Sequence, residues 1–146
     1  WKIKDSNSIS VQIFDVIFNS WAGYKHGLCI FGKSCGKALA LEHNGDLFAC
    51  DHYVEPKWKL GNLVASDLNY LIEGRVIRKF SNLKRNLVAD CKECKYLFIC
   101  NGGCPKNRLQ ASEDQVDLNY LCTAYKKLFS HSEDYMKRKV IEMGIK

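Results

Sequence analysis

The amino-acid sequence predicts a small, cysteine-rich α+β domain in which much of the backbone is irregular. Two segments, one near the start of the chain and one at its end, repeat apolar residues at helical spacing. Between them, an Asn-Gly pair separates two short apolar runs, which is the pattern of a β-hairpin. Eight cysteines among 146 residues lie mostly outside these elements. A chain of this length fits one domain with a core of modest size, or a compact piece of a larger enzyme.

A first helix is expected in the segment SISVQIFDVIFNSWAGY, residues 8–24. Its apolar residues fall close to a helical repeat and form one broad face. Ser8 or Ser10 is placed to cap the start of this helix, and Gly23 lies near its end. The next segment, HGLCIFGKSCGK, is rich in glycine and holds two cysteines, so we expect an irregular loop there.

The hairpin is predicted in KALALEHNGDLFACDHYV, around Asn44 and Gly45. This dipeptide tolerates the positive φ angles of a tight turn. The second strand of the hairpin would deliver Cys50 at its far end. The segment EPKWKLGNLVAS follows, and its proline and glycine indicate an extended or turn-rich connection.

Three more helices are expected in the second half of the chain. Ser66 or Asp67 can cap a helix through LNYLIEG, and VIRKFSNLKRNL has the pattern of a second short helix. From Asp117 to about Gly144, apolar and charged residues alternate at helical spacing. The long terminal helix would carry Cys122 near its start.

Charge and hydropathy exclude several classes of protein. The net charge of +6 arises from 22 basic and 16 acidic residues that are mixed along the chain, so nucleic acid is not expected as a partner. No apolar run approaches the roughly 20 residues that cross a bilayer, and no signal peptide opens the chain. We therefore expect a cytoplasmic protein without a membrane partner. Because the chain begins with Trp1, we expect it to be a piece of a longer protein.

The cysteines indicate metal binding. Four of them form C-x2-C-x5-C-x3-C in CKECKYLFICNGGC, residues 91–104. A C-x2-C pair binds one centre from a single turn, and cysteines from elsewhere in the chain complete the coordination. Unrelated buried cysteines would not cluster in this way. Four disulfides would fit the even count, but nothing in the sequence indicates secretion.

The spacing alone does not identify the metal, because zinc and iron-sulfur clusters both accept four thiolates. The four histidines lack the paired spacing of zinc fingers. Eight cysteines suffice for two centres with four ligands each. Such centres have no open coordination position, which suits structure or electron transfer better than activation of a bound water.

The order of the motifs resembles a known family. C-G-K-A-L, N-G-D, C-D-H-Y-V and K-L-G-N are followed by C-x2-C-x5-C-N-G-G-C-P-K and a later cysteine. Over roughly residues 29–125 the chain is similar to the SPASM domain, the C-terminal cluster-binding region of anaerobic sulfatase-maturating enzymes of the radical SAM superfamily. The resemblance implies a SPASM-type α+β domain at 29–125. Residues 1–28 would be a helical link to a radical SAM domain, and residues 126–146 a helical extension.

In that family, two auxiliary 4Fe-4S clusters share the thiols in an interleaved way. The resemblance implies that the first cluster is held by Cys29, Cys35, Cys50 and Cys104. It implies that the second is held by Cys91, Cys94, Cys100 and Cys122. Gly102 and Gly103 would let the backbone approach a cluster and leave N–H groups free to bond its sulfides.

Asp51 directly follows Cys50. Neighbouring strand residues point to opposite sides, so Asp51 would face away from a centre bound by Cys50. The resemblance implies that Asp51 is the general base that takes a proton from the substrate, a role that suits a carboxylate if burial raises its pKa. On the sequence alone, an aspartate that caps a turn is the other interpretation.

The implied reaction belongs to a longer enzyme. Its radical SAM domain would bind S-adenosylmethionine and a third 4Fe-4S cluster, and a 5′-deoxyadenosyl radical would start the oxidation of a cysteine or serine of a sulfatase polypeptide to Cα-formylglycine. Flavodoxin or ferredoxin would serve as the electron donor. This chain lacks the C-x3-C-x2-C motif of the SAM-binding cluster, so it is expected to be inactive by itself.

Two other functions stay open. Other peptide-modifying radical SAM enzymes carry the same accessory domain, and a non-catalytic zinc-binding interaction module would use the same thiols. The aspartate next to Cys50 and the full set of eight cysteines favour sulfatase maturation over the first of these. Iron and sulfide analysis separates clusters from zinc.

Overall fold

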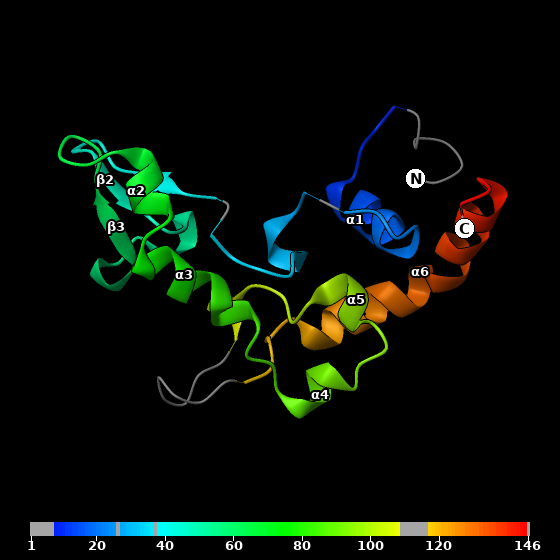
Figure 1. Ribbon diagram of the computed structural model, residues 1–146. Coiled ribbons are helices and arrows are strands. Elements are labelled where there is room, and N and C mark those ends of the chain that lie inside the picture. Colours follow the sequence, from blue (N-terminus) through cyan, green and yellow to red (C-terminus); the bar gives the residue numbers. More distant parts are fainter. Residues whose placement is uncertain (1–7, 26, 37, 109–116, 146) are drawn as a thin grey trace.

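The computed structural model describes residues 8–25, 27–36, 38–108 and 117–145. Its elements form two lobes (Figure 1). The sheet lobe contains a three-stranded sheet and two short helices, and the helical lobe contains helices from both ends of the chain. Irregular segments with short helical turns connect the lobes. This architecture confirms the predicted small α+β class.

The sheet is antiparallel, with the strand order β1-β2-β3. The predicted hairpin is confirmed: it is formed by β1 (Ala40–Leu41) and β2 (Asp46–Phe48). Gly45 adopts a φ of 87°, and Asn44 Oδ1 accepts a hydrogen bond from the Asp46 amide at 3.0 Å. The Asn-Gly pair therefore makes the turn because glycine tolerates the left-handed backbone and asparagine bonds across it.

The third strand, β3 (Lys59–Asn62), lies in the segment that the sequence indicates as a connection. That prediction is incomplete, because Gly61 interrupts the alternation of apolar residues by which a strand is recognised. A Cβ atom at Gly61 would lie 2.5 Å from Leu71 Cδ2, so a larger residue there would displace the Leu71 side chain. Asn62 Nδ2 donates a hydrogen bond to Asp46 Oδ1 at 2.8 Å and holds β3 against β2.

Two short helices, α2 (Leu68–Ile72) and α3 (Arg75–Ser81), follow the sheet. Asp67 is the residue that caps α2, since its Oδ1 accepts a hydrogen bond from the Asn69 amide at 2.8 Å. The end of α3 continues into a tighter 3-10 turn, Asn82–Lys84. The predicted second short helix therefore exists, but its last residues are wound differently.

The predicted first helix is α1 (Gln12–Trp21). Val11 occupies its N-cap position and makes no side-chain capping bond, so the prediction of a serine cap is wrong. Ser10 Oγ instead donates a hydrogen bond to Asp15 Oδ2 at 2.7 Å. The Ser10 hydroxyl therefore bonds a side chain of the first helical turn and does not cap the backbone N–H groups of that turn.

The cysteine motif lies between α4 (Ala89–Lys92) and the residues after α5 (Leu97–Cys100). The long terminal helix, α6 (Cys122–Glu142), begins at Cys122, later than predicted, and runs without a break past the proposed domain boundary at residue 125. Short 3-10 turns complete the chain: Cys29–Phe31, Asp51–Tyr53, Pro56–Trp58, Asn82–Lys84 and Pro105–Asn107.

Each lobe has its own hydrophobic core. In the helical lobe, the buried rings of Phe31 and Phe129 meet edge to face with 6.0 Å between their centroids. In the sheet lobe, Trp58 and Phe80 meet in the same way at 5.0 Å. Such pairs add to the free energy gained by burying apolar area. The two cores fix the lobes separately, and the irregular segments lie between them.

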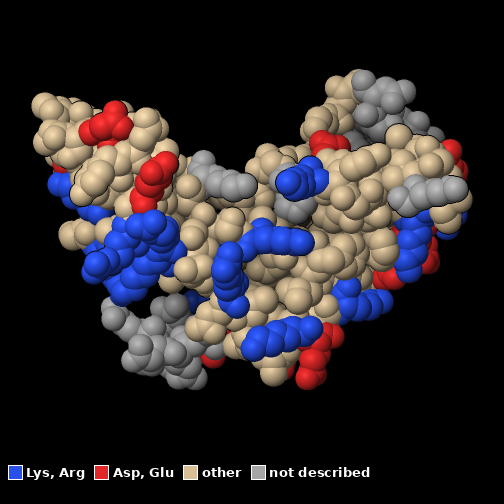
Figure 2. All heavy atoms as spheres, in the orientation of Figure 1, with Lys and Arg blue, Asp and Glu red and all other residues tan. Residues whose placement is uncertain are grey.

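Charged side chains are distributed over both lobes. Figure 2 shows basic groups interspersed with acidic ones, and the largest basic group on this face lies beside α3. None of the helices in the described part of the chain is both long enough and apolar enough to cross a bilayer.

Phe129→Ala is expected to lower the free energy of unfolding by about 3 to 5 kcal/mol, because the ring is 1% exposed in the core of the helical lobe. Ile141→Ala is the control on the same helix, where the side chain is 75% exposed, and should change the value by less than about 0.5 kcal/mol. Urea unfolding followed by circular dichroism measures both. Equal effects would contradict the packing of α6 described above.

Candidate metal centres

Four cysteines that are far apart in the sequence line one pocket, which we call site 1: Cys29, Cys35, Cys50 and Cys104. The pocket encloses about 360 Å³, part of it open to solvent. His52, Tyr53 and Lys84 also line it. Site 1 therefore collects residues from the segment before the sheet, from the end of the hairpin and from the segment after α5.

Cys29 is positioned by the 3-10 turn that begins with it, Cys29–Phe31. Lys84 Nζ donates hydrogen bonds to three carbonyl oxygens of this segment. The acceptors are Cys29 at 2.8 Å, Ile30 at 2.6 Å and Gly32 at 2.8 Å. The side chain of a residue from the turn after α3 thus holds the first cysteine of site 1 in place.

Cys50 lies two residues beyond β2, at the N-cap of the 3-10 turn Asp51–Tyr53. Its Sγ accepts a hydrogen bond from the His52 amide at 3.4 Å. The preceding residue, Ala49, is fully buried, and its amide donates to the Trp58 carbonyl at 3.0 Å. The hairpin therefore presents Cys50 from its far end, as the sequence predicts.

Cys104 reaches site 1 through a turn with three consecutive positive φ angles. Asn101, Gly102 and Gly103 adopt 47°, 76° and 66°. Glycine enters this region freely, and a Cβ atom at Gly103 would overlap the Asn119 side chain. Asn119 Nδ2 also donates to the Cys104 carbonyl at 3.3 Å. The Gly-Gly pair is therefore required by the shape of this turn.

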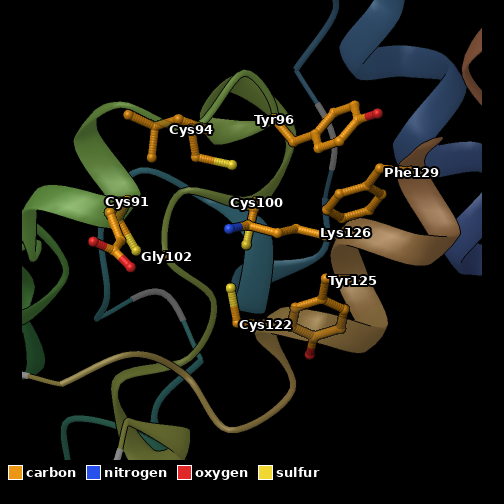
Figure 3. Close-up of a pocket in the computed structure, with 11 residues that line it drawn as sticks. Cys91, Cys94, Tyr96, Cys100, Gly102, Cys122, Tyr125, Lys126 and Phe129 are labelled. Carbon is orange, nitrogen blue, oxygen red and sulfur yellow. The ribbon is translucent and has the colours of Figure 1, made fainter.

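The other four cysteines line a second pocket, site 2: Cys91, Cys94, Cys100 and Cys122. They come from α4, the loop after it, the end of α5 and the start of α6. Figure 3 shows their side chains around a common space. This pocket encloses about 320 Å³, again partly open to solvent.

Aromatic rings close one side of site 2 (Figure 3). Tyr125 and Phe129, both on α6, stack with 6.0 Å between their centroids and an angle of 16°. Tyr96 packs against Phe129 at 5.8 Å. These rings belong to the core of the helical lobe, so the thiols of site 2 border on an apolar interior.

The two sets of cysteines are the sets that the family resemblance implies. All eight lie in the described part of the chain, and each is a free thiol. Cys100 belongs to site 2 and Cys104 to site 1, although only three residues separate them. The structure thus brings the predicted groups together, and their role as metal ligands stays a prediction.

Two thiols in each site have a raised pKa and resist ionisation. Burial raises the pKa of Cys50 to about 12 and that of Cys100 to about 11. Burial also raises the pKa of Cys35 and of Cys91, and neighbouring cysteines add to the effect. Adjacent buried thiols do not become thiolates together at neutral pH unless a cation compensates their charge. A metal centre supplies that charge and deprotonates its ligands, so both donor sets fit one.

Asp51 does not face away from Cys50, and the prediction that it does is wrong. The Cys50 thiol donates a hydrogen bond to Asp51 Oδ1 at 3.2 Å. The chain bends into a 3-10 turn directly after Cys50, so the alternation of a strand does not apply. The carboxylate is also exposed, and the hydrogen bond from Cys50 lowers its pKa, whereas the general-base argument assumes that burial raises it.

Two buried cations near the sites escape sequence analysis: Lys84, 2% exposed, and Arg108, 6% exposed. Arg108 donates to the carbonyls of Asn86 at 2.7 Å and Gly102 at 3.3 Å, so it ties the turn after α5 to the segment after α3. No local pattern distinguishes these two residues from the other basic residues of the chain. Their burial depends on segments that meet only in the folded protein.

A family model described as SPASM, an iron-sulfur cluster-binding domain, matches residues 29–95. This segment contains all three strands and five of the eight cysteines. Residues 29–95 are therefore similar to the SPASM family. Three cysteines of the two sites, Cys100, Cys104 and Cys122, lie beyond the matched segment, so the two pockets extend past it.

Curated proteins that are similar to this chain include sulfatase-maturating enzymes. The chain is 41% identical over 138 residues to a serine-type anaerobic sulfatase-maturating enzyme of Bacteroides thetaiotaomicron. This alignment covers 93% of the chain and 33% of the relative. The chain is also 30% identical over 128 residues to a cysteine-type anaerobic sulfatase-maturating enzyme of Clostridium perfringens, in an alignment that covers 88% of the chain and 35% of that relative. The chain thus spans about a third of the length of these relatives.

Solved structures share the fold of this chain. The structure of native anSMEcpe with bound AdoMet and Cp18Cys peptide aligns with a TM-score of 0.84 at 28% identity, over 95% of this chain and 38% of that one. A second structure, native anSMEcpe with bound AdoMet, aligns with a TM-score of 0.83 at 29% identity. This alignment covers 93% of this chain and 37% of that one. The similarity includes both lobes, since it covers nearly the whole chain.

Gly103→Ala is expected to destabilise the turn that joins the two sites. An alanine at a φ of 66° costs roughly 1–2 kcal/mol, and its Cβ would overlap Asn119 in addition. Gly27→Ala is the matched control, because nothing lies within 4 Å of a Cβ atom there. Urea unfolding of the two variants measures the difference, and equal values would argue against a strained turn at Gly103.

Proposed function

We propose that this SPASM domain holds one 4Fe-4S cluster in site 1 and another in site 2, as the auxiliary-cluster domain of an anaerobic sulfatase-maturating enzyme. The observation that carries the proposal is the convergence of four thiols on each of two pockets. Four thiolates are a complete ligand set for such a cluster. Zinc accepts the same ligands, and the match to an iron-sulfur family favours iron.

Backbone N–H groups near the ligands support the proposal. The Gly102 amide bonds the Cys100 sulfur, and the His52 amide donates to the Cys50 sulfur at 3.4 Å. Hydrogen bonds to ligand sulfurs stabilise thiolates and adjust the reduction potential of a cluster. When bound, the clusters would supply one-electron transfer. The residues of this chain would hold them and exclude water from the aromatic side of site 2.

The proposed substrate is a cysteine or serine side chain of a sulfatase polypeptide, which is oxidised to Cα-formylglycine. Relatives of both the serine type and the cysteine type support this class of substrate. S-adenosylmethionine and a third 4Fe-4S cluster would be bound by a radical SAM domain outside this chain. The solved anSMEcpe structure that contains both AdoMet and a peptide is consistent with such a partner domain.

Asp51 is the proposed general base. Its side chain is 63% exposed at the edge of site 1, so a polypeptide can reach it. An exposed aspartate is ionised at neutral pH, with or without the hydrogen bond from Cys50. If Cys50 is a metal ligand, its thiol proton is gone, and Asp51 Oδ1 no longer accepts the hydrogen bond that it accepts from Cys50 here. That oxygen is then able to accept a proton from the substrate.

The proposed reaction requires an electron donor. Flavodoxin or ferredoxin in the cytoplasm would supply the electron that cleaves S-adenosylmethionine. Neither nucleic acid nor a membrane is part of the proposal. Within the longer protein, residues 1–28 would connect to the radical SAM domain, residues 29–125 would form the cluster-binding domain and residues 126–146 would extend it.

Anaerobic reconstitution of the chain should yield about eight irons and eight sulfides per molecule. Cys35→Ala and Cys94→Ala should each lower both contents by about half, because each variant removes one ligand from one site. Metal and sulfide analysis measures the outcome. Two zinc ions that iron does not replace would support a zinc-binding interaction module instead.

Asp51→Asn in the full-length natural protein should keep the iron content but lower the rate of formylglycine formation by about 10²- to 10⁴-fold, the usual contribution of a general base. Asp67→Asn is the control, since asparagine also caps a helix and Asp67 lies at the start of α2. Mass spectrometry of a sulfatase peptide measures the product. An unchanged rate would show that Asp51 is not the general base, and the proposal that both sites hold clusters would not be affected.

A further inference from the structure

Lys84 is a buried cation that uses all of its hydrogen-bond donors. The residue is 2% exposed, and its Nζ donates to three carbonyl oxygens at 2.6 to 2.8 Å. A neutral amine has only two N–H groups, so three donated bonds require the protonated ammonium. The fold therefore fixes one positive charge at this position.

This charge faces site 1. Lys84 lines the pocket together with the four cysteines, and it interacts electrostatically with Cys35, Cys104 and Cys29. It does not line site 2. Among the residues that the structure describes, no carboxylate forms an ion pair with Lys84. Its charge is thus available to the thiolates of a ligated site 1.

Arg108 is the second buried cation in this region, but its position differs. Its electrostatic interactions reach Cys91 and Cys100 of site 2 as well as Cys35 of site 1. Arg108 therefore acts on both sites. Lys84 is the buried cation that distinguishes one site from the other.

We propose that Lys84 raises the reduction potential of the cluster in site 1 and so favours the transfer of an electron to that site. The inference rests on the proposed function, in which both sites hold clusters. A cluster with four thiolate ligands is negatively charged, and its charge becomes more negative when it gains an electron. A buried cation stabilises the reduced form more than the oxidised form, because charges interact strongly away from water.

The electron that site 1 would accept has a defined source in the proposed reaction. Hydrogen abstraction leaves a substrate radical, Asp51 takes a proton from the substrate, and the substrate then loses one electron to form a double bond at Cβ. Lys84 is buried and donates its hydrogen bonds to backbone carbonyls, so we treat it as a positioning residue that would act through the cluster. Its hydrogen bonds also hold the Cys29 turn, and the experiment has to separate the two effects.

The experiment compares Lys84→Gln, which removes the charge, with Lys84→Arg, which keeps it, in the full-length natural protein after anaerobic reconstitution. Reductive titration followed by electron paramagnetic resonance gives the potential of each cluster. The signal that disappears in Cys35→Ala belongs to site 1, and the signal that disappears in Cys94→Ala belongs to site 2. Lys79→Met, which removes an exposed lysine from α3, is the control.

In Lys84→Gln the equilibrium constant for adding one electron to site 1 should fall at least tenfold, which equals a potential about 59 mV more negative. Lys84→Arg and the control should stay near the unchanged protein, and site 2 should not shift. An unchanged site 1, or an equal shift at both sites, would overturn the inference. Loss of iron from site 1 in Lys84→Gln would overturn it in favour of a structural role. Absence of iron from the unchanged protein would overturn the proposed function instead.

Discussion

Both sites depend on one short segment, residues 100–104. Cys100 lines site 2 and Cys104 lines site 1, so the chain has to change direction within the three residues between them. The left-handed backbone of these residues achieves this change. Asn101 Nδ2 donates to the Phe31 carbonyl at 2.8 Å and joins the turn to the segment between Cys29 and Cys35. The turn therefore fixes Cys100 and Cys104 relative to the segment that carries Cys29 and Cys35.

The two hydrophobic cores support different sites. Cys35 and Cys50 pack against the core of the sheet lobe, whereas Cys94 and Cys100 pack against that of the helical lobe. Between the cores, buried polar side chains hold the backbone by hydrogen bonds to its carbonyl groups. Lys84 satisfies three carbonyls, and the guanidinium of Arg108 satisfies others. Irregular backbone is stable here because its polar groups find such partners.

Local features of this fold could be predicted from the sequence, and features that depend on distant contacts could not. The Asn44-Gly45 turn and the Asp67 cap involve neighbouring residues, so their residue types suffice. The strand around Gly61 depends on packing against Leu71, which no local pattern reveals. The grouping of the cysteines into two sets is implied by the order of motifs in a known family. The alternation of side chains along a strand does not predict the orientation of Asp51, because the backbone bends into a 3-10 turn at Cys50.

Helix α6 begins with Cys122, a residue of site 2, and packs along α1, so the first and last helices of the described chain share one anchor. A helix of 21 residues is about 30 Å long. A ligand bound through Cys122 would therefore stabilise the first turn of α6, while the apolar core shared with α1 holds the rest of the helix.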